Sequence, residues 1–136
     1  MADREIVDNL IDSVAGALPY DLESEKAILA LCLKGTDKIV DLLNGKLSSE
    51  CFFDKRHQQI FDAISGLFID NKKIDSYLVA DYLTKKGLID KAGGISYVTS
   101  LVDSYAISAN ANSYVDIVYE KYKLRNLIKV LEDMDK

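Results

Sequence analysis

The sequence predicts an all-α fold: a compact multi-helix globular domain followed by one long C-terminal helix. Apolar residues recur three and four positions apart through most of the 136 residues, which is the period of an amphipathic helix. No segment alternates apolar and polar residues over the length of a typical strand. The chain has one proline, Pro19, against 7 glycines, so long stretches lack the residue that most strongly interrupts helices.

The first part of the chain predicts a short helix and then a central one. Residues 3–15 carry apolar residues on one face, so we expect a short, partly ordered helix there. The stretch YDLESEKAILALCLKG follows, in which Asp21 can accept hydrogen bonds from the first free N–H groups and Gly35 suits the end of the helix. After Lys26 this helix is apolar almost all round, which is typical of the helix at the centre of a small bundle.

Four further helices are predicted before the long C-terminal one. A short helix is expected over residues 36–44, and FFDKRHQQIFDAISGLFIDN contains the clearest core helix, with His57 on its apolar face. The other two helices are expected over residues 75–86 and 94–105. The residues expected at the four helix starts are Thr36, Asp54, Asp75 and Gly94.

The C-terminal segment predicts a helix with two apolar faces. At about 100° per residue, one face holds Val115, Val118, Tyr119 and Tyr122, and the roughly opposite face holds Ile117, Leu124, Leu127, Ile128, Leu131 and Met134. The first face can complete the core of the preceding domain, whereas the second needs another helix, from further chain or a second subunit. We therefore divide the chain into an N-terminal segment (1–17), a globular helical domain (18–108) and a long helix (109–136).

Composition excludes some classes of partner and location. The net charge is −5, so no general electrostatic attraction to nucleic acid is expected. The longest apolar run, AILALCL, is far shorter than a membrane span, and the N-terminus lacks a secretory signal pattern. Cys32 and Cys51 lack the CxxC spacing and resemble small buried apolar residues. We expect a soluble, cytoplasmic protein with no membrane partner.

No stretch of the sequence predicts a catalytic, cofactor or metal site. Gly93 and Gly94 precede a helix, but they are not followed by the lysine and hydroxyl residue of a GxxxxGK[ST] phosphate loop. They are therefore interpreted as residues that mark the start of the helix. His57 is the only histidine and is expected to be a core or subunit-contact residue. Glu23 and Glu25 lie near a helix start, where solvated charge that suits the helix dipole is the ordinary explanation.

Five stretches, in order, resemble the N-terminal domain of the DnaB-type replicative DNA helicases. They are LPYDLESEKAIL, FFDKRHQQIFDAI, KKIDSYLVADYLTKKG, GGISYVTSL and SANANSYVDIVYEKYKLRNLI, which together run from about Leu18 to Ile128. The resemblance of any one stretch is weak evidence, but five stretches in order at the family's spacing are specific to the family.

The resemblance implies a helical domain that pairs with its copies, as a dimer or a trimer of dimers, in a collar over a hexameric ATP-driven motor. In that family the collar binds primase and, in some cases, a helicase loader. The ATP, the Mg²⁺ and the DNA contacts would belong to a motor domain that this chain lacks, and the chain would end after the first helix of a helical hairpin. The alternative that the residues leave open is a free-standing helical adaptor unrelated to replication.

Particular residues fall on the family pattern. We predict that Tyr97, Arg125 and the second face of the last helix, represented by Ile117, Leu124, Ile128 and Leu131, contact a second subunit or primase, because aromatic and arginine side chains concentrate interface energy. Structural roles are expected for His57, Asp75, Gly93, Gly94, Asn110 and Tyr114, with Asn110 capping or turning into the last helix.

Overall fold

A computed structural model describes residues 3–6, 18–36 and 39–135 of the chain, and within these ranges it is helical, without a strand. Residues 3–6 are helical. The elements that follow are α2 (Leu22–Leu33), α3 (Ile39–Asn44), η1 (Ser49–Cys51), α4 (Lys55–Ile69), α5 (Ser76–Lys85), α6 (Ile95–Ser100), η2 (Leu101–Asp103), η3 (Ser108–Asn110) and α7 (Ala111–Met134). The predicted all-α fold with a long C-terminal helix is confirmed.

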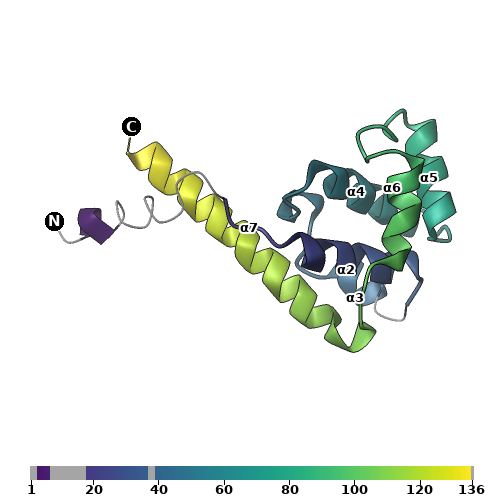
Figure 1. Ribbon diagram of the computed structural model, residues 1–136, viewed down its shortest axis with the longest axis horizontal. Coiled ribbons are helices and arrows are strands. Elements are labelled where there is room, and N and C mark those ends of the chain that lie inside the picture. Colours follow the sequence, from purple (N-terminus) through teal and green to yellow (C-terminus); the bar gives the residue numbers. More distant parts are fainter. Residues whose placement is uncertain (1–2, 7–17, 37–38, 136) are drawn as a thin grey trace.

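Helix α2 is the centre of the globular part, as its composition predicts. It contacts α7, α4, α3 and η2, and Figure 1 shows it between α7 and α4. All its residues from Ser24 to Leu33 except Lys26 are buried. Asp21 starts the helix by accepting a hydrogen bond from the N–H of Ser24 at 3.0 Å. A helix buried on nearly every side needs neighbours all round, and this arrangement supplies them.

Helices α4, α5 and α6 form the part of the globule away from the distal end of α7 (Figure 1). Asp75 caps α5 by accepting from the N–H of Leu78 at 2.8 Å, which confirms its predicted structural role. The helix expected over residues 94–105 is shorter than predicted. It changes to the 3₁₀ form at Leu101, and Ser104 is extended, so Tyr105 leaves the helix and is exposed.

Helix α7 is a rod of 24 residues that packs on the globule from Ala111 as far as Arg125. Asn110 occupies its N-cap position but makes no capping hydrogen bond with its side chain. Of the two roles expected for Asn110, side-chain capping is therefore not observed, and the 3₁₀ turn that ends at Asn110 leads into the helix. The hydroxyl of Tyr114 accepts a hydrogen bond from the N–H of Ile107 at 3.0 Å, which ties the incoming chain to the first turn of α7.

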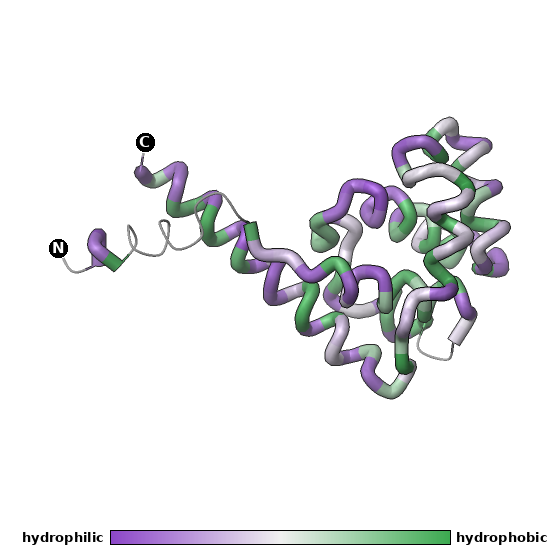
Figure 2. The backbone as a smooth tube through the Cα atoms, in the orientation of Figure 1, coloured by the Kyte–Doolittle hydropathy of each residue, from purple (hydrophilic) through white to green (hydrophobic). Residues whose placement is uncertain are grey.

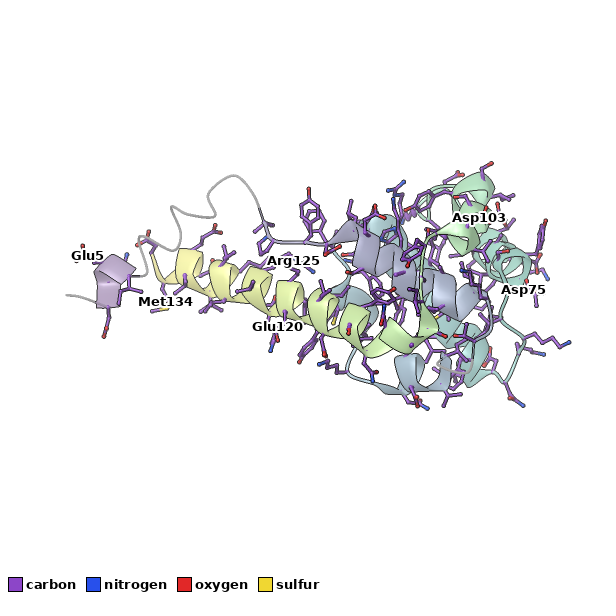
Figure 3. The ribbon with its side chains drawn as sticks, turned by 60° about the horizontal axis from the view of Figure 1, so that its bottom comes forward. Glu5, Asp75, Asp103, Glu120, Arg125 and Met134 are labelled. Atoms are coloured by element: carbon purple, nitrogen blue, oxygen red, sulfur yellow. The ribbon has the colours of Figure 1, made fainter. Side chains whose placement is uncertain are left out.

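After Arg125, α7 extends beyond the globule, and hydrophobic residues recur along this distal part (Figure 2). Residues 3–6 lie beside that end, where Arg4 forms an ion pair with Asp135. Figure 3 shows Glu5 near Met134 at this end of the molecule, and Asp75 and Asp103 at the other. The rest of the predicted N-terminal helix over residues 3–15 lies outside the described residues.

Candidate functional site

A buried polar network joins α2, α4 and α6. The carboxylate of Glu25 accepts hydrogen bonds from the N–H of Phe53 at 2.8 Å and of Asp54 at 3.3 Å. It also lies 2.8 Å from Nδ1 of His57. The other ring nitrogen of His57, Nε2, lies 2.6 Å from the hydroxyl of Tyr97. Because the carboxylate can only accept, Nδ1 carries the proton, and in the neutral ring Nε2 accepts from Tyr97.

This network corrects one sequence-based interpretation. Glu25 was interpreted as a solvated charge at a helix start, yet it is 1% exposed, and His57 is 0% exposed. A buried carboxylate is tolerated only when hydrogen bonds satisfy its oxygens, and three donors do so here. His57 is a core residue with polar partners, in agreement with the core alternative.

Tyr97 is held on a second side by Arg56. The guanidinium carbon of Arg56 lies 4.0 Å from the centroid of the Tyr97 ring, in cation–π geometry. Arg56 donates to both carboxylate oxygens of Asp54, from Nε at 3.1 Å and Nη2 at 2.7 Å. These bonds lower the pKa of Asp54, while burial raises the pKa of Tyr97. Tyr97 is therefore fixed in place by contacts within the chain.

Gly93 leaves the space that this arrangement needs. Its φ is +96°, in a region that side chains other than glycine rarely adopt. A Cβ atom built on it would lie 2.8 Å from Cδ2 of Tyr97 and 3.0 Å from Cδ of Arg56. Gly94, with φ +89°, occupies the N-cap position of α6. Both glycines thus have the structural roles predicted for them at the start of this helix.

Arg125 attaches α7 to the rest of the globule. Its Nη1 donates to the carbonyl oxygen of Pro19 at 2.9 Å and its Nη2 to that of Cys51 at 2.8 Å. The guanidinium carbon also lies 5.5 Å from the ring centroid of Phe53, and the residue is 6% exposed. Burial lowers the pKa of this guanidinium. The hydrogen bonds of Arg125 thus connect three segments of the same chain.

The second apolar face of α7 is partly open and partly covered. Ile117 is 37% and Leu124 41% exposed, and Leu127, Val130 and Met134 are also exposed. Ile128 and Leu131 were placed on the same face, yet they are buried, at 4% and 8% exposure. Neither belongs to the core cluster that α2 and α4 share with Val118. The open part of this face therefore consists of Ile117, Leu124, Leu127 and Met134, which we call the open α7 face. Val130 is exposed on a different side of the helix, about 120° from Leu124.

Comparison with known proteins assigns this arrangement to a family. The family model described as the DnaB-like helicase N terminal domain matches residues 17–120. The chain belongs to that family. It is 36% identical over 111 residues to the replicative DNA helicase DnaB of Mycobacterium leprae (strain TN), covering 82% of this chain and 18% of that protein. The corresponding protein of Buchnera aphidicola subsp. Baizongia pistaciae (strain Bp) is 30% identical over 127 residues, which cover 93% of this chain and 27% of the relative.

A solved structure supports the same assignment. The crystal structure of the N-terminal domain of DnaB helicase from Mycobacterium tuberculosis matches with a TM-score of 0.77 and 34% identity, covering 82% of this chain and 79% of that one. The chain therefore has the fold of a DnaB N-terminal domain and spans less than a third of the length of the two curated relatives named above.

The DnaB-family residues singled out in the sequence fall into two groups in the structure. Tyr97 and Arg125 are held by contacts inside the chain, whereas Ile117 and Leu124 face outward. That any of these residues contacts a subunit or primase stays a prediction. Glu25 is the principal residue missed. The signal that could have revealed it is its position one helical turn before the buried Ile28 and Leu29, in a helix that is apolar almost all round after Lys26.

The cysteines and potential metal ligands of this DnaB-type domain form no site among the residues that the structure describes. Cys32 and Cys51 are free and buried, as expected, and burial raises the pKa of Cys32 to about 12. Within the described ranges, no three His, Cys, Asp or Glu side chains are grouped to hold a metal ion. None of the helices described is long and apolar enough to cross a membrane.

Proposed function

We propose that this chain is the docking and oligomerisation domain of a replicative DNA helicase, in which it organises the hexamer collar and binds primase and, in some cases, a loader. Family membership supports the helicase context and favours it over a free-standing adaptor. The observation that carries the proposal is the open α7 face. A helix that completes its own core with Val118 yet exposes Ile117 and Leu124 is suited to packing against a second helix.

The energetics favour a partner on this face. Four large apolar side chains of the second face are exposed along α7, and apolar surface gathered in this way commonly marks an interaction site. Burying it would gain about 25 cal/mol for each Å² of apolar surface removed from water. A helix from a second copy of the chain would bring the same kind of surface.

Substitution at the centre of the open α7 face tests this proposal. We expect the wild-type chain to show a mass in sedimentation velocity that rises above 15.2 kDa with concentration. Leu124→Asp should lower that self-association about tenfold or more, because a charge would be buried at the contact. Its helicity should stay unchanged, since Leu124 is 41% exposed.

The matched control is Asn126→Asp, which adds the same carboxylate at an exposed position two residues further along α7. It should associate as the wild type does. Equal association of Leu124→Asp and wild type would remove the open α7 face from the proposal.

A further inference from the structure

A groove lies at the end of the globule where α4 ends and α5 begins. Its volume is about 590 Å³, and its floor is formed by Leu67, Leu78 and Tyr82. Four lysines surround it: Lys72 and Lys73 from the loop between the helices, and Lys85 and Lys86 from the end of α5. Figure 3 places Asp75, at the start of α5, at the end of the molecule opposite Met134. The groove is therefore a different surface from the distal part of the open α7 face.

Local geometry positions the lysines beside the floor. Asn71 has φ +56° and ends α4 with two hydrogen bonds, from its own N–H to Phe68 O at 3.0 Å and from the N–H of Lys72 to Leu67 O at 2.8 Å. This is the pairing of a Schellman motif, and it reverses the chain directly over Leu67. Lys72 and Lys73 therefore return alongside the groove, and both are exposed.

Gly66 lets Tyr82 approach α4 closely and form part of the floor of the groove. A Cβ atom at position 66 would lie 2.6 Å from the hydroxyl of Tyr82 and 3.1 Å from Cζ, so only glycine admits the ring this close to α4. The Nζ of Lys86 lies 5.4 Å from the centroid of the same ring. An aromatic ring in the floor with a cation above it presents both apolar and positive surface to a ligand.

The charge around the groove is opposite to that of the rest of the chain. Its lining contains four lysines and two aspartates, Asp70 and Asp81, a net charge of +2. The other 13 basic and 20 acidic residues of the chain give −7. Asp81 forms an ion pair with Lys85 at 2.9 Å. The side chain of Asp75 caps α5 by accepting a hydrogen bond from the N–H of Leu78. Lys72 and Lys73 form no ion pair with any residue that the structure describes.

We infer that this groove binds an acidic amphipathic helix of a partner protein. Apolar side chains of such a helix, spaced three and four residues apart, would pack on Leu67, Leu78 and Tyr82. Its carboxylates would lie against Lys72 and Lys73, which complements their positive charge. Nucleic acid is disfavoured, because a phosphate backbone does not use an apolar floor and the remainder of the chain carries −7. The inference does not depend on the proposed function.

The test is an NMR titration of the isotope-labelled chain with synthetic peptides of about 18 residues, or five helical turns. The acidic probe has leucines at helical spacing and glutamates elsewhere, and the comparison peptide has lysine in place of every glutamate. We expect the acidic probe to shift the amide signals of the groove residues saturably. Its affinity should fall about fivefold between 50 and 300 mM salt, because the rim contacts are exposed charges. The basic peptide should not shift these signals.

Two variants distinguish the contribution of the rim, which consists of Lys72 and Lys73, from that of the apolar floor. Lys72→Glu combined with Lys73→Glu should weaken binding of the acidic probe about tenfold, because the substitutions reverse the charge at the rim. Leu78→Ser should weaken it about fivefold at both salt concentrations, since it removes apolar surface. All three positions are exposed, so the fold is expected to persist, and circular dichroism checks this.

The matched control for the rim is Lys55→Glu. Lys55 is an exposed lysine at the first position of α4, roughly 20 Å along the helix from the groove. It should bind the acidic probe as the wild type does. Equal binding of the acidic and basic peptides, no saturable shift at about 1 mM probe, or stronger shifts of the same signals by a single-stranded oligonucleotide would each overturn the inference.

Discussion

At the scale of single residues, Glu25 and His57 show how position in the fold changes the chemistry of a side chain. A glutamate in the first turn of a helix ordinarily remains in water, where it interacts with the positive end of the helix dipole. Here the helix is buried on nearly all sides, so the same carboxylate is 1% exposed and organises the start of α4. Through His57 it also fixes the hydroxyl of Tyr97.

We expect Glu25→Gln to lower the free energy of unfolding by about 2 kcal/mol, because an amide NH₂ would replace one of the two acceptor oxygens and face backbone or imidazole donors. Urea unfolding followed by circular dichroism measures this. The control is Glu23→Gln in the same helical turn, where the side chain is 86% exposed and pairs with Lys26 at 3.6 Å. It should change stability by less than about 0.5 kcal/mol, and an equal effect of both substitutions would contradict the role of Glu25.

Arg125 illustrates a limit of inference from residue type. Arginine is common at interfaces, which is why the sequence suggests a partner contact for it. In the fold its guanidinium bonds the carbonyl oxygens of Pro19 and Cys51, which lie 106 and 74 residues away in the chain. Backbone carbonyl oxygens so far away in the chain cannot be recognised from the residues around Arg125. Their identity therefore becomes visible only once the chain is folded.

At the scale of elements, caps and end signals predicted where most helices begin. Asp21, Asp54 and Asp75 each cap the helix expected of them, because a cap acts within its own turn. The predictions were weaker where neighbouring segments decide the outcome. The helix that starts after Gly94 ends earlier than its apolar pattern indicates, and Asn110 starts α7 without a side-chain cap.

The connection between α5 and α6 gives a prediction at this scale, based on Gly87 at the end of α5 and Gly93 before α6, both with positive φ. Gly87 has φ +71°, and no atom lies within 4 Å of a Cβ built on it. Gly87→Ala should therefore lower the free energy of unfolding by about 1 kcal/mol through backbone strain alone. Gly93→Ala should cost at least about 1 kcal/mol more, since its Cβ would also collide with Tyr97 and Arg56. Urea unfolding of both variants tests this difference, and equal losses of stability would show that the close approach of Tyr97 is unimportant.

At the scale of the whole molecule, α7 combines two roles. Its inner face, with Val118 and Arg125, completes the globule. Its outer side carries the open α7 face, which begins beside the globule at Ile117 and continues beyond it to Met134, with residues 3–6 beside the end of the helix. The sequence predicted the two faces, but it also assigned Ile128 and Leu131 to the exposed one. Their burial in the folded chain reduces the surface left for a partner to the positions around Ile117 and Leu124.

Primase binding gives a prediction at this scale. If the domain docks primase, isothermal titration with the C-terminal domain of the primase from the same organism should give a complex in the micromolar range. We expect Leu124→Asp to weaken that complex and Asn126→Asp to leave it unchanged, because only the first places a charge on the open α7 face. No measurable heat with both proteins at several hundred micromolar would contradict primase docking, while the self-association result would stand separately.

The sequence by itself determined the all-helical class, the central place of α2, most helix starts and the two-faced character of α7, because these depend on periodicity and capping within a few residues. Only the tertiary structure decided that Glu25 is buried against His57, that Arg125 binds distant carbonyl oxygens, and that Ile128 and Leu131 are covered. It also created the groove between α4 and α5. Such features depend on which segments contact one another in the folded chain, and the spacing of residues within one helix does not indicate those contacts.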